Sequence, residues 1–414
     1  MEKKEQLKKY NLDNSSLFYP IMATKKAQSL FRLTVVLCDQ VDGEILRQAV
    51  QKTMDRFPIF KTELKMGYAW HYLSENTKDV KVFDRSKGVL TPIDPKETNG
   101  YLFRFVYEGN TIILEVFHGL CDGTGASIFF KGVLQQYRKL QGVEIGEENA
   151  IDFNEEFFDE ENEDAFKKYY TPIKFKDADI KSLTGVKPQL ITGTINPDGY
   201  TIETYFGSYK EIGALAKERG VSFTAFIAGI VAHSIANADY GKNPIVVMVP
   251  VNLRAIFPSK TVRNFASFVR LTFDRNDCLD VEECIKEASV QLKEKTKVHE
   301  LEKMLGTTVR TEKTLILKIA PLWLKMAVAK FFRLFLKSRQ TIIISNLGRF
   351  NLPEGLGVDK AIFNINVSKN ARTNVAIISL GDTVAISFTK TIVENKVETG
   401  VVEAIEKMGG KFVK

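Results

Sequence analysis

The sequence predicts an α/β protein of the α+β type, built from two lobes with mixed sheets. The chain has 414 residues, which is too many for one ordinary core and suits two domains. Helix-like and strand-like segments alternate irregularly, with hairpin-like pairs among them, which argues against a single parallel sheet. Because the chain has neither a Gly-x-Gly-x-x-Gly loop nor a Walker loop, the sequence does not predict a dinucleotide-binding or P-loop fold.

The first part of the chain predicts a strand, a helix and then a hairpin. The helix opens at Asp42 and carries apolar residues at helical spacing. Residues 101–107 and 111–117 are strand-like runs separated by a short turn, which is typical of a hairpin. A glycine-rich loop follows, and either Asp122 or Thr124 caps the next helix. Further strands are expected at residues 29–37, 62–65 and 69–73.

The pattern dissolves between about residues 141 and 200, which we interpret as the connection between the lobes. The lobes are therefore expected at residues 1–170 and 171–414. The connection begins with an acidic stretch at residues 144–164, which holds eleven Asp and Glu and no Lys or Arg. We expect this stretch to be a solvated surface segment.

The second part of the chain resumes with alternating strands and helices, and ends in a closing meander and a final helix. The expected strands lie at residues 201–207, 244–250, 265–273 and 341–345, those of the meander at 361–367, 375–380 and 383–390, and the helices at 210–219, 222–239, 281–303 and 394–408.

Composition predicts a cytoplasmic protein. The amino terminus lacks the apolar core of a secretory signal, and no uncharged apolar run reaches about 18 residues. The four cysteines are scattered, with no Cys-x-x-Cys pair and no zinc-like spacing, so we expect reduced thiols.

The charge is +7 overall, and outside the acidic stretch the chain is strongly basic. A basic body favours anionic partners such as coenzyme A phosphates, a phosphopantetheine carrier, lipid headgroups or nucleic acid; a generic basic surface is an equal alternative. Since no basic motif with interleaved aromatic residues is present, a nucleic-acid partner is not predicted.

The sharpest local motif begins at His118 and reads His-Gly-Leu-Cys-Asp-Gly. His118 follows an apolar strand at the start of a loop, where polar groups are commonly exposed in a cleft. A neutral imidazole can take the proton from a hydroxyl or amine near neutral pH. From the residues alone, three other interpretations stay open: a satisfied strand-end histidine, a metal ligand with Asp122, or the base for a Cys121 nucleophile.

The motif His118-x-x-x-Asp122-Gly123 resembles the signature of the chloramphenicol acetyltransferase-like superfamily. That superfamily includes condensation domains, plant BAHD acyltransferases, polyketide-associated acyltransferases and alcohol acetyltransferase-like proteins. Other blocks resemble it in the family's order and span nearly the whole chain. They are residues 41–60 with Arg56-Phe57-Pro58, residues 249–254 (Val-Pro-Val-Asn-Leu-Arg), residues 263–265 (Arg-Asn-Phe) and residues 345–348 (Ser-Asn-Leu-Gly).

The resemblance implies two similar lobes with a tunnel between them and His118 as the general base. Asp122 would turn away from the substrate and pair with Arg254, and Gly123 would allow close packing at the tunnel. Ser345 and Asn346 would lie near the tunnel and polarise the oxyanion. Ordinary turn chemistry is the alternative for Arg254 and these two residues.

The sequence also departs from the family pattern. Phe117 stands where many condensation domains have a second histidine, and the plant Asp-Phe-Gly-Trp-Gly motif is replaced by Ser-Asn-Leu-Gly-Arg at residues 345–349. No carrier or adenylation domain accompanies the lobes, so the resemblance is greatest to the free-standing alcohol acetyltransferase-like type.

The resemblance therefore implies transfer of an acyl group from acyl-CoA to a small alcohol or amine. It implies no metal and no permanently bound cofactor, and we expect a monomer. A carrier-protein thioester is the alternative donor, and a non-catalytic binding protein on the same fold is the alternative from another class.

Residues 315–337 form one more unusual segment, rich in apolar and basic residues. If the segment forms a helix from Pro321, its cations lie mostly on one side of that helix, and Trp323 contributes a large aromatic side chain. Such a helix could rest on a membrane or meet a lipophilic acceptor. A helix packed in the core is the alternative, and we favour it from sequence.

Overall fold

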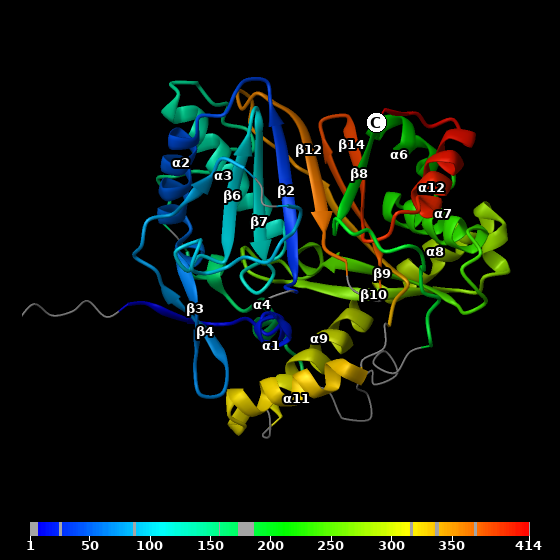
Figure 1. Cartoon of the computed structure of the whole chain (residues 1–414), viewed down its shortest axis with the longest axis horizontal. Helices are drawn as coiled ribbons and strands as arrows, with labels where there is room; N and C mark the ends of the chain where they lie inside the picture. The colour runs from blue at the N-terminus through cyan, green and yellow to red at the C-terminus, as the bar shows by residue number, and fades with distance from the viewer. Residues whose placement is uncertain are drawn as a thin grey trace, which may run out of the picture.

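The computed structural model contains two lobes side by side, joined by strands and helices from both halves of the chain (Figure 1). It describes residues 7–24, 27–85, 88–156, 158–172, 186–314, 318–335, 339–367 and 371–413. Each lobe is built on one large sheet, and a small three-stranded sheet lies beside the first. The mixed α/β prediction is confirmed.

The first lobe is built on a five-stranded sheet with the order β12-β2-β7-β6-β5. Two helices pack against each other on this sheet, and the stacked rings of Phe60 and Phe129, with centroids 4.0 Å apart, lie in the core beneath them. The strands are β12 (Val358–Ile365), β2 (Leu30–Leu37), β7 (Thr111–Phe117), β6 (Phe103–Glu108) and β5 (Val82–Phe83), and the helices are α2 (Gly43–Arg56) and α3 (Gly123–Leu140).

The small sheet has the order β1-β4-β3 and lies next to a short helix, α1 (Phe18–Met22). Its strands are β1 (Lys9–Asn11), β4 (His71–Glu75) and β3 (Thr62–Met66). In Figure 1, α1 lies below the first lobe, close to two helices from the second half of the chain, α9 (Val298–Lys313) and α11 (Leu322–Phe335).

The second lobe is built on a seven-stranded mixed sheet with the order β10-β9-β11-β13-β14-β8-β15. Its helix α7 (Phe223–Asn237) is apolar on nearly all sides and buried, as expected for a helix enclosed between packed layers. The strands are β10 (Ala266–Phe273), β9 (Ile245–Asn252), β11 (Ile342–Arg349), β13 (Thr373–Leu380), β14 (Thr383–Lys390), β8 (Thr201–Ser208) and β15 (Phe412–Val413), and the other helices are α6 (Tyr209–Glu218), α8 (Val281–Lys295) and α12 (Lys396–Lys407).

Strand β12 corrects the predicted closing meander. Only β13 and β14 form the expected hairpin, while β12 pairs antiparallel with β2 in the sheet of the first lobe. The alternation of residues 361–367 identifies a strand, but alternation cannot tell which edge the strand joins. The sequence division at residue 170 therefore does not describe the membership of the two sheets.

Two other predictions need correction. The expected helix at residues 281–303 is two helices, because α8 ends in a cap at Thr296 and α9 begins at Val298. The acidic stretch is mostly exposed, but Glu161 is buried and forms an ion pair with Arg56, whose Nη1 lies 2.8 Å from its carboxylate. The described part of the connection also holds a 3-10 helix at Asp159–Asn162 and the short helix α4 (Ala165–Lys168); residue 157 and residues 173–185 lie outside the described part of the chain.

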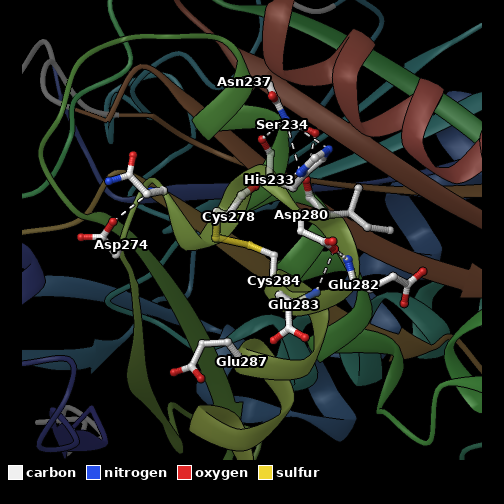
Figure 2. The surroundings of a disulfide bond; sticks show 12 residues. His233, Ser234, Asn237, Asp274, Cys278, Asp280, Glu282, Glu283, Cys284 and Glu287 are labelled. Carbon is white, nitrogen blue, oxygen red and sulfur yellow. Dashed lines mark hydrogen bonds between the residues drawn. A yellow bond between two sulfur atoms is a disulfide. The ribbon is translucent and has the colours of Figure 1, made fainter.

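The prediction of four reduced thiols is wrong for two of them. Cys278 and Cys284 form a disulfide that joins the turn before α8 to the first turn of that helix (Figure 2). Asp280 lies between them and caps α8 by accepting hydrogen bonds from the amides of residues 282 and 283. A spacing of six residues has no recognised motif, which is why the pairing was missed from sequence. The cytoplasmic location stays a prediction.

Within the described residues, no single helix is long and apolar enough to cross a membrane; α6 and α7, bent by 84° against each other, reach that length and composition only as a pair.

Candidate active site

A cavity of about 230 Å³ lies between the two large sheets. The first lobe contributes its wall around His118 and Phe31, and the second contributes residues of β9, β10 and β11. Most of the surface of this wall is apolar, but many of the lining residues are polar. A pocket of this character, placed between lobes, is where binding sites are usually found.

His118 lies at the carboxyl end of β7, where the chain leaves the sheet for α3. The backbone holds the residue there through a hydrogen bond from its amide to the carbonyl of Ser29, at 2.8 Å. The imidazole lines the cavity and is stacked on Tyr19, with ring centroids 4.6 Å apart. Phe31 meets it edge to face at 5.2 Å. Two aromatic side chains therefore pack against the imidazole ring, and His118 still lines the cavity.

Asn264 determines which nitrogen of the imidazole carries the proton. Its Nδ2 donates to the carbonyl of His118 at 3.0 Å and to the hydroxyl of Ser16 at 2.8 Å. These two bonds set the amide orientation, so its Oδ1 must accept from Nδ1–H of His118, 2.9 Å away. Nε2 is then left with its lone pair, as a base requires.

A buried polar network holds Asn264 in place. The Ser16 hydroxyl, which accepts from the amide, itself donates to the carboxylate of Asp13 at 2.5 Å. Asp13 is fully buried and lies 3.5 Å from Nε of Arg263. The donors therefore run in one direction, from the imidazole through the amide and hydroxyl to a carboxylate, which is a rigid arrangement.

Burial lowers the pKa of His118 below the ordinary imidazole value of 6.5, because the charged form loses its hydration. The negative charge of Asp122 and the hydrogen bond to Asn264 oppose this effect but are smaller. The imidazole is therefore neutral at neutral pH, which is the state able to accept a proton.

Asp122 is among the residues that line the cavity, but both oxygens of its carboxylate are held by hydrogen bonds from the protein. Arg254 donates to both of its carboxylate oxygens, at 2.8 and 3.2 Å. The amides of Gly125 and Phe265 donate to it as well, at 3.0 and 2.8 Å. Asp122 thus caps α3 and pins the loop after His118 to the second lobe. The ion pair expected from the resemblance is present.

Two glycines allow the loop to pack closely. A Cβ on Gly123 would lie 2.9 Å from a methyl of Leu347 on β11, which is the close approach expected from sequence. A Cβ on Gly125 would lie only 1.9 Å from the carbonyl oxygen of Val262, which the backbone cannot easily relieve. Gly125 is therefore the stricter requirement, although the sequence motif does not include it.

Ser345 and Asn346 both line the cavity from β11, but they are not equivalent. The Asn346 amide donates to the Thr224 hydroxyl at 3.0 Å, and its carbonyl accepts from the amide of Gly348 at 2.9 Å. Its side chain is occupied locally. No hydrogen bond joins the Ser345 hydroxyl to another described residue, which leaves Ser345 the better candidate oxyanion donor.

The competing interpretations of the motif lose support. Cys121 is buried, and burial raises its thiol pKa well above the ordinary value, which disfavours the nucleophilic thiolate. Both Asp122 oxygens are bound by Arg254 and by amides, so the carboxylate is not free to share a metal with His118. In the described ranges, no three metal-binding side chains gather.

A second cavity of about 340 Å³ adjoins the first and shares Thr124, Asn252 and Leu347 with it. Two cations, Lys131 and Arg349, line this second cavity. Burial lowers the pKa of Lys131 from its ordinary value. Through these shared residues the two cavities are neighbours, so cationic side chains lie near the cavity that His118 lines.

Sequence reasoning missed the residues that support the imidazole. Asn264 lies within residues 263–265, which resemble the family, but nothing in one sequence shows that its amide meets a histidine 146 residues away. Ser16 and Tyr19 come from an irregular segment near the amino terminus, and no local pattern marks them.

No protein-family model matches the chain, and no curated protein matches it. Among solved structures, the trichothecene 15-O-acetyltransferase of Fusarium sporotrichioides is similar, with a TM-score of 0.66 at 9% identity, covering 99% of this chain and 96% of that one. The starter condensation domain of rhizomide synthetase, in complex with C8-CoA, has a TM-score of 0.63 at 12% identity and coverage of 97% and 94%.

The epimerization domain of tyrocidine synthetase B is similar as well, with a TM-score of 0.62 at 13% identity and coverage of 97% and 95%. Across nearly the whole chain, these likenesses confirm the two-lobed fold of the chloramphenicol acetyltransferase-like superfamily. At such low identity they concern the fold alone.

Proposed function

Starting from a chloramphenicol acetyltransferase-like fold with a neutral imidazole in its interlobe cavity, we propose that this chain is an acyltransferase. It moves an acyl group from a pantetheine thioester, in the first instance acyl-CoA, to an alcohol or amine. The observation that carries the proposal is the bond from His118 Nδ1–H to Asn264, which leaves the lone pair on Nε2 of a residue that lines the cavity.

In the proposed reaction, Nε2 takes the proton of the acceptor hydroxyl or amine as its oxygen or nitrogen attacks the thioester carbon. The carbonyl oxygen becomes an oxyanion, and the proposed donor to it is the hydroxyl of Ser345, a residue that lines the cavity. When the tetrahedral intermediate collapses, the carbon–sulfur bond breaks and the imidazolium returns its proton to the leaving thiolate. No covalent enzyme intermediate is needed.

The donor is proposed to enter through the second cavity, because Lys131 and Arg349 there suit the phosphates of coenzyme A. Similar folds accept such a ligand, since the rhizomide condensation domain was solved with C8-CoA. A carrier-bound thioester has the same pantetheine arm and is the alternative donor. Supplying one acyl group on coenzyme A and on a carrier protein, in parallel assays, separates the two.

The test is the variant His118→Ala, compared with His299→Ala, whose ring is exposed. Thermal-shift screening with acyl-CoA esters first identifies a donor, and turnover is then measured with a panel of alcohols and amines. We expect the first variant to lose roughly 100-fold or more in kcat and to keep its melting temperature, while the control keeps both. Equal turnover in the two variants would reject the mechanism.

A further inference from the structure

Helix α11 is fixed to the first lobe along one face. The amide of Leu322 donates to the carbonyl of Tyr68, at 2.7 Å, in the turn between β3 and β4. Lys325 donates to the carbonyl of Ala69, and its Nζ lies 3.6 Å from the ring centroid of Trp70. Leu322 and Lys325 are both buried. The orientation of the helix is therefore determined by these contacts.

The opposite face of α11 is apolar and exposed to solvent. The exposed fraction is 67% for Trp323, 40% for Leu324, 45% for Val328 and 60% for Phe331. At about 100° per residue, these side chains occupy an arc of roughly 140°. A surface helix normally turns polar side chains to solvent, but the exposed face of α11 is mainly apolar. The prediction that this helix packs in the core is therefore right for one face of α11 and wrong for the other.

Further exposed apolar residues lie near the amino end of α11. Tyr68 and Met66, beside the turn that holds Leu322, are 76% and 65% exposed, and Ile319 is 60% exposed. We call the exposed apolar side chains of α11 together with these three the α11 face.

The charged residues of α11 and of the segments that flank it in the sequence are all positive. From residue 313 to residue 339 the chain holds seven Lys and Arg and no Asp or Glu, and the next acid is Glu354. Among the described cations of this stretch, Lys313, Lys318, Lys330 and Arg339 are exposed. A second copy of the chain would bring cations against cations across this face, so a dimer contact is disfavoured.

We propose that the α11 face docks on an anionic lipid bilayer. Exposed Trp and Tyr side chains suit the boundary between headgroups and acyl chains, and the aliphatic residues suit the layer beneath. Lysines beside an apolar helix face add attraction to acidic headgroups. Docking does not depend on the proposed reaction, because no residue of the α11 face lines the cavity.

Binding to vesicles tests this inference with the full chain. Phosphatidylcholine vesicles with and without phosphatidylglycerol are sedimented with the protein. We expect binding to the anionic vesicles that weakens with salt, and a blue shift of the emission of Trp323. The chain has two tryptophans, so Trp70→Phe assigns the signal to Trp323.

Trp323→Ser/Val328→Ser should weaken vesicle binding roughly tenfold or more, and Lys318→Gln/Lys330→Gln should remove most of the preference for anionic lipid. The matched controls are Val290→Ser/Val298→Ser and Lys286→Gln/Lys293→Gln, which change exposed residues of α8 and α9. Failure of the unmodified protein to bind anionic vesicles overturns the proposal. So does a dimer in sedimentation velocity that Trp323→Ser/Val328→Ser dissociates.

Discussion

Replacing Asn264 separates its positioning role from a merely structural one. Asn264→Leu removes the acceptor of Nδ1–H, 2.9 Å from the ring, and two donated bonds at 2.8 and 3.0 Å. A lost hydrogen bond of this kind costs about 0.5–1.5 kcal/mol, and about 1.4 kcal/mol changes a rate tenfold. With the tautomer no longer enforced and the ring free to tilt, kcat should fall roughly 10- to 100-fold.

Asn264→Asp is the informative partner. A carboxylate still accepts from Nδ1–H, so the tautomer and most of kcat should survive. Its negative charge favours the imidazolium and raises the pKa of His118. In the native protein burial lowers that pKa, so the rate should fall only when the pH drops below the usual imidazole range. In the Asp variant this acid limb should move to higher pH.

The assay is the pH dependence of kcat for the native protein and both variants, with Asn366→Leu as a control. Asn366 also lines the cavity, but its amide donates to the carbonyl of Gln28 and is not the partner of the imidazole. Changing it should leave the acid limb where it is. Full kcat in Asn264→Leu, or an unmoved acid limb in Asn264→Asp, would refute the role given to this amide.

Two further predictions concern the loop that carries the imidazole. Arg254→Met should lower the free energy of unfolding by about 3–5 kcal/mol, because Asp122 would remain as a buried unpaired charge; denaturation should show partial recovery in Asp122→Asn/Arg254→Met. Gly125→Ala should destabilise the protein strongly through its clash with Val262, whereas Gly213→Ala, whose Cβ meets nothing closer than 3.9 Å, should be neutral or stabilising by up to about 1 kcal/mol in the same measurement.

Local patterns predicted most elements, but not where they lie. The helix opening at Asp42 is α2, and its cap is the Asp42 carboxylate, which accepts from the amides of Glu44 and Ile45. The hairpin before His118 is β6 and β7. These follow from periodicity and turn chemistry. Periodicity carries no information on the partner of a strand, so the pairing of β12 with β2 could not be predicted from the sequence.

For the candidate site the limit is similar. The spacing of His118 and Asp122 is local, so the sequence displays it, and the partner Arg254 came from the family resemblance. The support from Asn264 and Ser16 depends on three distant segments meeting in space. Whether a side chain such as Asn346 is already occupied likewise depends on its neighbours in the fold.

The placement of β12 has a consequence for how ligands come and go. Strand β12 pairs with β2 from Val358 to Ile365, so a strand from late in the chain belongs to the sheet of the first lobe. If the two lobes opened about a hinge, part of the hydrogen bonding between β12 and β2 would have to break, or the segments that lead to β12 would be strained. We therefore expect reactants to enter and leave through openings that are present without domain motion. The rate of turnover should then be limited by diffusion through these openings or by the chemical step, and not by a hinge motion of the lobes.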